Sequence, residues 1–499
     1  MLARWIATAA LIILGLPVLA LGTKTQGPST ASSPVPHGAK ADAASAPATP
    51  RSEAFTKDYT AACTLLVSKL LGLATWCNEQ QLFAQRDKLW HAVIALEPDN
   101  LDARKGLRFG RNTDGTWKEP AQHDVKDRNP KALEEFPAKR SAALSTWCDT
   151  LFALLEKEHA SPALSNEIYD EILSVDPDQE HVHDLRGESK GAEAWVLKES
   201  VIAKQRRADI KATIAAAKSD ATSKPVDPND ADKKISPTWA STADVCGVRI
   251  FSNGDANECN SIGQIVYAAC RLFTMLYALP AKLPKGLTVY SFTSTAARDA
   301  LLASLPQLSD ADKKTWMGAA GMGLPNTYSV ALWHPDPKRR LDCLSRHLVM
   351  HLMQEAWSID GRQGWVYEGM GLYLSRELCG TRLTWFGLAT SGAEAEKRRG
   401  RLIAPESNWM NEALQLFEGE KPPDLAELMG KSIEAMGVDD MLAAYALAAF
   451  FVEGHPAECA ELLRQIGFAE PPATAVKRVL GLTLAELQTR LVRWLKERK

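Results

Sequence analysis

Two histidines four residues apart, His347 and His351, constrain the fold of this chain more than any other feature. They lie in the sequence RHLVMH at residues 346–351. Residues four apart lie on the same face of a helix, so the two imidazoles can converge on one metal ion. The pattern predicts a helix that carries half of a metal site. Because the chain has 10 histidines in 499 residues, a chance pair of helical histidines is the alternative.

A glutamate completes the pattern. Glu368 lies in the sequence GWVYEGMGLY at residues 364–373, which we expect to begin a second helix with the carboxylate facing the histidines. The two segments resemble those of the gluzincin peptidases, in which a glutamate-glycine helix supplies the third zinc ligand after an HExxH helix. The resemblance implies that His347, His351 and Glu368 are zinc ligands.

The sequence departs from this family at the catalytic residue. The glutamate that follows the first histidine in HExxH is the general base, and here that position holds Leu348. A missing base costs about 10²- to 10⁴-fold in rate. Glu355 is the nearest replacement, but it lies about 12 Å along the helix from His347. Some gluzincins also stabilise the oxyanion with a tyrosine, and the resemblance assigns that role to Tyr445, with a buried structural tyrosine as the alternative.

The region around these residues alternates between strand and helix patterns. Strands are predicted at 245–251, 287–292 and 328–333, and helices at 256–277, 295–305 and 341–357. Beyond Glu368 the apolar periodicity predicts helices to the end. This order resembles a gluzincin domain, so residues 237–499 are expected to fold as an α+β domain with a small sheet and a helical C-terminal half.

Residues 57–205 carry a repeated helical pattern. An apolar helical periodicity ends at the sequence EPDN (97–100), and a similar one ends at DPDQ (176–179). Trp117 after the first pattern is matched by Trp195 after the second. We predict duplicated helical hairpins that resemble degenerate tetratricopeptide repeats and could bind a protein. The alternative is two unrelated helix pairs that end at common Pro-Asp stops.

Three other segments are expected to lie outside the folded core. The apolar run after Arg4 predicts a secretory signal peptide at 1–22, with an N-terminal membrane anchor as the alternative. The Ala/Ser/Pro-rich residues 23–56 predict a disordered linker. The polar, proline-containing residues 206–236 predict a second linker with a helical start. The chain is thus expected to be secreted or periplasmic, with no membrane span after signal removal.

Composition excludes some classes of function. A formal net charge of -3, without basic blocks that contain aromatic residues, argues against nucleic-acid binding. The nine cysteines form no CxxC pair, so neither a cysteine zinc site nor a thioredoxin-type motif is indicated. Secretion permits disulfides, although the sequence does not define which cysteines pair.

Three interpretations of function remain open. The first is a secreted, catalytically inactive relative of the zinc peptidases that binds a peptide or protein partner in its cleft, with or without Zn²⁺. The second is a working zinc hydrolase with a non-standard general base. The third is a helical-repeat scaffold in which the histidine pair is a coincidence.

Overall fold

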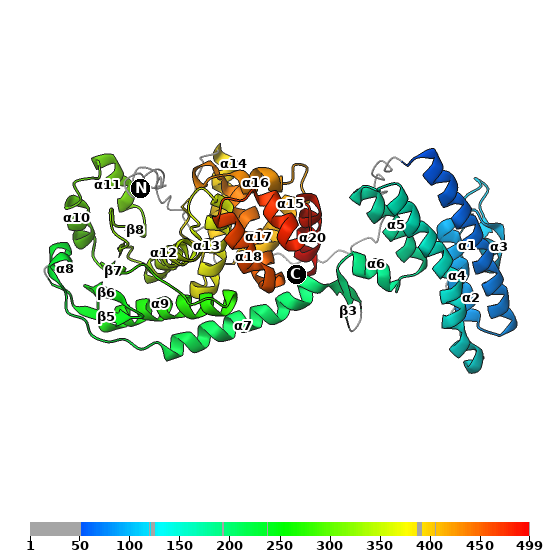
Figure 1. Cartoon of the computed structure of the whole chain (residues 1–499), viewed down its shortest axis with the longest axis horizontal. Helices are drawn as coiled ribbons and strands as arrows, with labels where there is room; N and C mark the ends of the chain where they lie inside the picture. The colour runs from blue at the N-terminus through cyan, green and yellow to red at the C-terminus, as the bar shows by residue number, and fades with distance from the viewer. Residues whose placement is uncertain are drawn as a thin grey trace, which may run out of the picture. The chain divides into compact units, whose positions relative to one another are not determined.

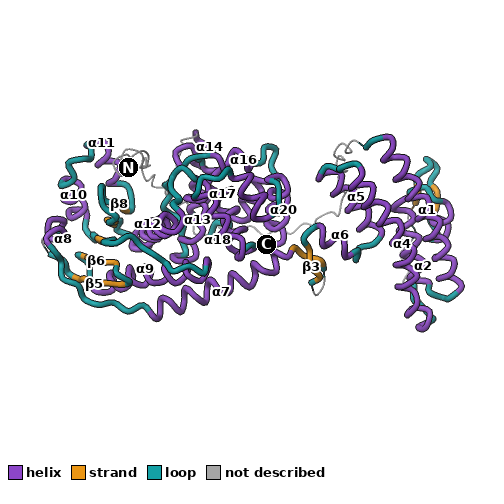
Figure 2. Tube along the Cα trace, in the orientation of Figure 1, coloured by secondary structure: helices purple, strands orange, loops and turns teal. Residues whose placement is uncertain are grey.

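A computed structural model describes residues 51–118, 120, 125–191, 194–236, 238–386, 392–404 and 406–498. The predicted signal peptide and residues 23–50 of the predicted linker lie outside the described residues. The fold class is α+β, as the sequence predicts, and most of the described chain is helical (Figures 1 and 2). The chain divides into two compact units, with the boundary between Trp195 and Val196.

The N-terminal unit contains the same order of elements twice. The first copy consists of α1 (Glu53–Glu79), α2 (Phe83–Leu96), α3 (Leu101–Gly106) and the paired strands β1 (Gly110–Arg111) and β2 (Trp117–Lys118). The second consists of α4 (Pro130–Lys157), α5 (Pro162–Val175), α6 (Glu180–Leu185) and the paired strands β3 (Glu188–Lys190) and β4 (Trp195–Leu197), and the boundary between the units falls inside β4. Helix α1 begins inside the segment 23–56 that was predicted to be a linker.

The two copies also share a side-chain contact. Trp117 Nε1 donates a hydrogen bond to Asp99 Oδ1 (2.8 Å), and Trp195 Nε1 donates one to Asp178 Oδ1 (3.0 Å). Each aspartate follows a proline just beyond the second helix of its copy. The Pro-Asp sequences that end the two helical patterns therefore position equivalent acceptors for equivalent tryptophans.

Helix α1 has an apolar composition that its packing explains. Among the described residues, it is the one helix with the length and composition of a membrane span, although we expected none beyond the signal peptide. The helix packs against α2 and α4, and Leu66, Leu70 and Ala74 are buried. A core helix of this unit accounts for the composition.

The helical start predicted for the segment 206–236 is present, but this part of the chain packs into the C-terminal unit. Helix α7 (Lys198–Asp220) covers the first half of that segment, and α8 (Asp230–Ile235) lies near its end. Ala203, Ile210 and Ile214 are buried, and α7 packs against helices α9 and α17 of the C-terminal unit. The many charged residues of α7 hid a narrow apolar face with helical spacing.

The C-terminal unit contains a five-stranded sheet. Its strands are β5 (Ser241–Val245), β6 (Val248–Ser252), β7 (Thr288–Ser291), β8 (Gly321–Gly323) and β9 (Val330–Leu332). They lie in the order β5-β6-β7-β9-β8. The β6–β7 and β7–β9 pairs are parallel, whereas the β5–β6 and β8–β9 pairs are antiparallel.

Part of this sheet differs from the sequence-based prediction. The single strand predicted at 245–251 is a hairpin, because the chain turns at Cys246 (φ 54°) and Gly247 (φ 79°). Both residues have the positive φ that a tight hairpin turn requires. Strand β8 was not predicted, because its three residues include two glycines, which are depleted in strands.

Helices cover the sheet and form the rest of the unit. They are α9 (Ala256–Tyr277), α10 (Thr295–Ala303), α11 (Asp310–Met317), α12 (Pro337–Trp357), α13 (Gly364–Cys379), α14 (Gly392–Ile403), α15 (Trp409–Phe417), α16 (Leu425–Gly430), the 3₁₀ helix η2 (Ile433–Ala435), α17 (Val438–Gly454), α18 (Pro456–Gly467), α19 (Pro472–Leu480) and α20 (Leu484–Glu497). Helix α9 packs against β5, β6 and α12, and α13 packs between α12 and α17.

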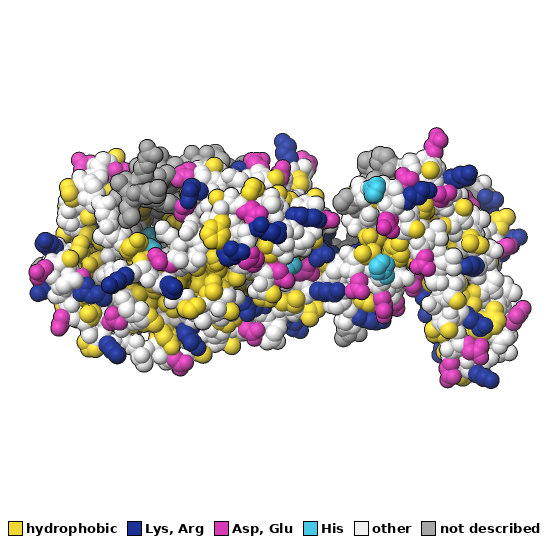
Figure 3. Space-filling model, in the orientation of Figure 1, with side chains coloured by type: hydrophobic (Ala, Val, Ile, Leu, Met, Phe, Trp, Pro, Cys, Tyr) yellow, Lys and Arg dark blue, Asp and Glu magenta, His cyan; other side chains and the backbone are white. Residues whose placement is uncertain are grey.

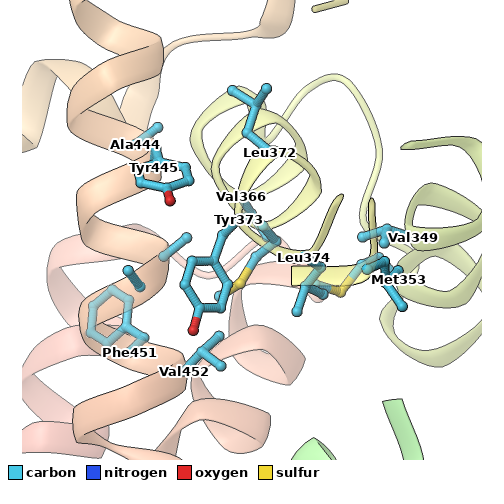
Figure 4. Close-up of a cluster of buried hydrophobic side chains, with 14 of the residues drawn as sticks. Val349, Met353, Val366, Leu372, Tyr373, Leu374, Ala444, Tyr445, Phe451 and Val452 are labelled. Carbon is cyan, nitrogen blue, oxygen red and sulfur yellow. The ribbon is translucent and has the colours of Figure 1, made fainter. Parts of the chain in front are cut away.

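The core of this unit joins α12, α13 and α17. In Figure 4, Val349 and Met353 of α12 lie near Leu374 of α13, and Tyr373 of α13 faces α17. Residues 441–454 of α17 are all buried. On the face shown in Figure 3, Lys/Arg and Asp/Glu side chains alternate with apolar atoms, in keeping with the small net charge.

Candidate functional site

Helix α12 carries the two histidines. The helix begins at Pro337, where Asp336 Oδ1 accepts a hydrogen bond from the Lys338 backbone N–H (2.9 Å). His347 and His351 lie one turn apart, and their exposed fractions are only 8% and 9%. The sequence therefore predicted correctly that a helix holds both imidazoles.

Each imidazole has a nitrogen that lacks a partner. Neither His347 Nε2 nor His351 Nδ1 has a hydrogen-bond partner among the described residues. Burial, together with the neighbouring His351 and Arg346, lowers the pKa of His347 to about 3. Burial also lowers the pKa of His351 to about 4, although a hydrogen bond with the Tyr328 backbone opposes this shift. Both rings are thus neutral near pH 7, the state in which imidazole binds metals.

Strand β8 and two aromatic residues surround these rings. A Cβ atom added to Gly323 of β8 would lie 3.6 Å from His347 Cε1, so the strand passes directly beside this imidazole. The Phe386 ring lies 5.2 Å from the His347 ring, and the Tyr328 ring lies 5.9 Å from the His351 ring. Tyr328 is 41% exposed, so the site reaches the surface beside His351.

Glu368, the predicted third ligand, is bound by an arginine. Arg346 Nη2 lies 2.6 Å from Glu368 Oε2, and both side chains are fully buried. The Phe386 backbone N–H donates to the other oxygen, Glu368 Oε1 (2.9 Å). Arg346 Nη1 also donates to the Glu368 carbonyl oxygen (3.3 Å). The carboxylate thus has a buried cation on one oxygen and an N–H donor on the other.

The surroundings of Arg346 are shaped to hold it. A Cβ atom at position 371 would lie 1.5 Å from Arg346 Nη1, so Gly371 leaves the space that the guanidinium fills. On another side, the Arg346 Cζ atom lies 4.8 Å from the centre of the Phe386 ring, a distance suited to a cation–π contact. The Arg346 side chain therefore extends from α12 into a space that Gly371 leaves open on α13.

These residues do not fit a zinc site with three protein ligands. Across the described ranges, no three His, Cys, Asp or Glu side chains are placed to hold one metal ion. A divalent cation at Glu368 would be repelled by the guanidinium already bound there. That His347, His351 and Glu368 hold one metal ion therefore stays a prediction, and in this arrangement Arg346 occupies the carboxylate of the third expected ligand. Arg346 directly precedes His347 in the sequence, but its pairing with Glu368 was not predicted.

The residues considered for catalysis also lie elsewhere. Leu348 is 1% exposed and belongs to the main hydrophobic core, and Glu355 is exposed. The Tyr445 hydroxyl accepts a hydrogen bond from Arg382 Nη1 (3.3 Å), and its ring packs against Trp409 at 4.8 Å. Burial raises the pKa of Tyr445. These contacts are those of the buried structural tyrosine that was the alternative to an oxyanion role.

Comparison of the chain with family models, with curated proteins and with solved structures finds no match.

Proposed function

We propose that this chain is a secreted, catalytically inactive relative of the zinc peptidases that binds a peptide or protein partner. The observation that carries the proposal is the buried ion pair between Arg346 and Glu368. It occupies the carboxylate that a gluzincin-type site would use as its third ligand. Leu348 occupies the position of the general base and is buried in the core. The two imidazoles remain, but a leucine stands at position 348, where a carboxylate would activate a water molecule beside them.

Strand β8 supplies a surface for an extended peptide. It is the last strand in the sheet order, so one of its edges has no strand beside it among the described residues. On the other edge, Ala320 O accepts from Trp333 N (2.9 Å) and Leu324 N donates to Ser329 O (2.7 Å). Alternate residues of an antiparallel strand direct their backbone groups to opposite edges. Gly321 and Gly323 therefore direct their N–H and C=O groups away from β9.

An added strand would pair with the N–H and C=O groups of Gly323, which is exposed, whereas Gly321 is buried. Main-chain hydrogen bonds to an edge strand give affinity, and pockets for alternate side chains give specificity. Gly323 has no side chain to obstruct the approach, and it lies beside His347. The half-exposed Tyr328 ring and the two histidines would then contact the side chains of the bound segment. Because the binding would use main-chain pairing with an edge strand, we expect an extended peptide and not the surface of a folded protein as the partner.

The catalytic part of the proposal is tested with the purified full chain. Wild type is expected to show no hydrolysis of an unfolded protein substrate above background, and to retain less than one equivalent of zinc after dialysis against Zn²⁺. Hydrolysis that is abolished both by a chelator and by His347→Ala would overturn the proposal. Arg346→Leu releases Glu368, and we expect it to raise zinc affinity by about tenfold or more.

The binding part is tested at Gly323. A library of extended peptides is screened against wild type, and the best binder is titrated against two variants. Gly323→Pro removes the outward N–H group and is expected to weaken binding by about tenfold, the equivalent of about 1.4 kcal/mol. Gly323→Ala keeps that group and places its Cβ atom at an ordinary contact distance, so it serves as the matched control. Equal affinity for both variants would show that the peptide does not pair with β8.

A further inference from the structure

Two cysteines lie side by side at the tip of the β5–β6 hairpin. Cys246 occupies the first turn position, where its φ of 54° is uncommon for a residue other than glycine. Cys270 lies on α9, the helix that packs against β5. The two residues line the same cavity, and their thiols are close enough for each to shift the pKa of the other. The hairpin and the helix thus bring together sulfurs that are 24 positions apart in the sequence.

The other thiols near this region have different partners. Cys259 Sγ lies 3.1 Å from Ser241 Oγ, and Cys379 Sγ lies 2.7 Å from Ser345 Oγ. Each of those two sulfurs has a serine hydroxyl group as its hydrogen-bond partner. The contact between Cys246 and Cys270 instead joins two groups that can be oxidised together.

Both thiols can be reached from solvent. They line one cavity of about 520 Å³, whose wall also includes Tyr267, Arg271 and Thr274. Cys246 is exposed, whereas Cys270 is partly buried. A small reagent can therefore reach Cys246 first, with Cys270 directly behind it.

The electrostatics of the pair favour attack by Cys246. The hydrogen bond from Cys270 lowers the pKa of the Cys246 thiol to about 7, although burial opposes this shift. The same contact, together with burial, raises the pKa of Cys270. Because the thiolate is the nucleophile, Cys246 is the attacking thiol and Cys270 the resolving thiol.

We propose that Cys246 and Cys270 form a disulfide that joins the β5–β6 hairpin to α9. The oxidant is a disulfide, either a small molecule such as oxidised glutathione or a protein disulfide. The Cys246 thiolate attacks one oxidant sulfur, which forms a mixed disulfide and releases one thiol. Cys270 then gives up its proton and attacks Cys246 Sγ, which releases the second thiol. Two protein thiols are oxidised, and one oxidant disulfide is reduced to two thiols.

The proposal does not depend on the binding function. It rests on the placement of two sulfurs about the hairpin, remote from the residues assigned to the β8 surface. Disulfides persist in oxidising compartments, so the bond is consistent with the predicted signal peptide. It would close a loop that contains the first turn of the sheet and most of α9, and thereby restrict the unfolded chain.

The test uses the full chain, reduced and then incubated with oxidised glutathione. Free thiols are blocked, the chain is digested without reductant, and linked peptides are identified by mass. We expect one linkage, between the peptides that contain residues 246 and 270, and a fall from nine blocked cysteines to seven. A reductant should break this disulfide, after which both cysteines should again react with the blocking reagent.

Two variants and one control complete the test. Cys246→Ser and Cys270→Ser should each abolish the linkage, whereas Cys259→Ser should leave it intact. In the reduced wild type, alkylation of Cys246 should rise with pH around a midpoint of about 7. Full blocking of both cysteines after oxidation, or linkage of either to a different cysteine, would overturn the proposal. The linked peptides found in wild type test the proposed disulfide even if a variant fails to fold.

Discussion

Removal of one partner from the Arg346–Glu368 pair should cost far more than removal of both. Glu368→Gln keeps an oxygen for the Phe386 N–H group but leaves the Arg346 cation buried and uncompensated. Arg346→Met leaves a buried carboxylate without its cation. Both side chains are fully buried, so each single variant should lower the free energy of unfolding by about 3–5 kcal/mol.

The double variant provides the sharper comparison. Arg346→Met with Glu368→Gln removes both charges and keeps similar volumes, so it should cost less than either single variant. The resulting coupling free energy should be at least about 3 kcal/mol, because breaking a buried pair leaves the surviving charge unpaired. A coupling of this size would place the ion pair among the main interactions that hold α12 against α13.

The assay is urea unfolding of the full chain, followed by tryptophan fluorescence. Because the chain has two compact units, transitions are fitted separately and assigned with Ile168→Ala, which removes a fully buried side chain from the N-terminal unit. Lys496→Met is the matched control, since the Lys496–Glu418 pair is about half exposed and should cost less than about 1 kcal/mol. Additive effects of the two single variants, or costs no larger than that of the control, would refute the reasoning.

Four further outcomes are expected. Leu348→Glu buries a carboxylate in the core, so it should lose about 4 kcal/mol or more in urea unfolding and gain no peptidase activity. Gly371→Ala should displace Arg346 and lower thermal stability, and Arg346→Met should partly restore it by removing the clash. Ile210→Ala should cost about 2–4 kcal/mol if α7 is part of the core, whereas a linker would give almost none. Burial lowers the pKa of His455, so the folded protein binds a proton there less readily than the unfolded chain does. The free energy of unfolding should therefore be highest above the unfolded histidine pKa of about 6.5 and should fall as the pH drops below it. Urea midpoints measured across this pH range should show the fall for wild type but not for His455→Asn.

The sequence predicted secondary structure best where apolar residues recur with a regular helix or strand spacing. The helix predicted at 341–357 is α12, and the strand predicted at 287–292 contains β7. Side chains at positions 347 and 351 share a face for reasons of helix geometry alone. These predictions needed no knowledge of the partners in space.

Prediction failed where the partner in space decided the outcome. The spacing placed Glu368 near the histidine helix but gave no indication of which group would take its carboxylate. Arg346 leaves α12 about 100° around the helix from His347, a direction in which its long side chain reaches α13 instead of solvent. Likewise, the charged residues of α7 suggested a linker, because the sequence does not reveal that α9 and α17 cover its apolar face.

Under the proposed function, Arg346 and Leu348 together connect the absence of catalysis to the stability of the domain. In a gluzincin-type site, a metal ion would hold the histidine helix and the glutamate helix together through its ligands. Here the guanidinium makes that connection, because it starts from α12 and binds both the side chain and the carbonyl oxygen of Glu368 on α13. Leu348, also on α12, belongs to the main hydrophobic core. Since protein groups supply this cohesion, the peptide binding that we propose at the edge of β8 beside His347 requires neither a metal ion nor hydrolysis.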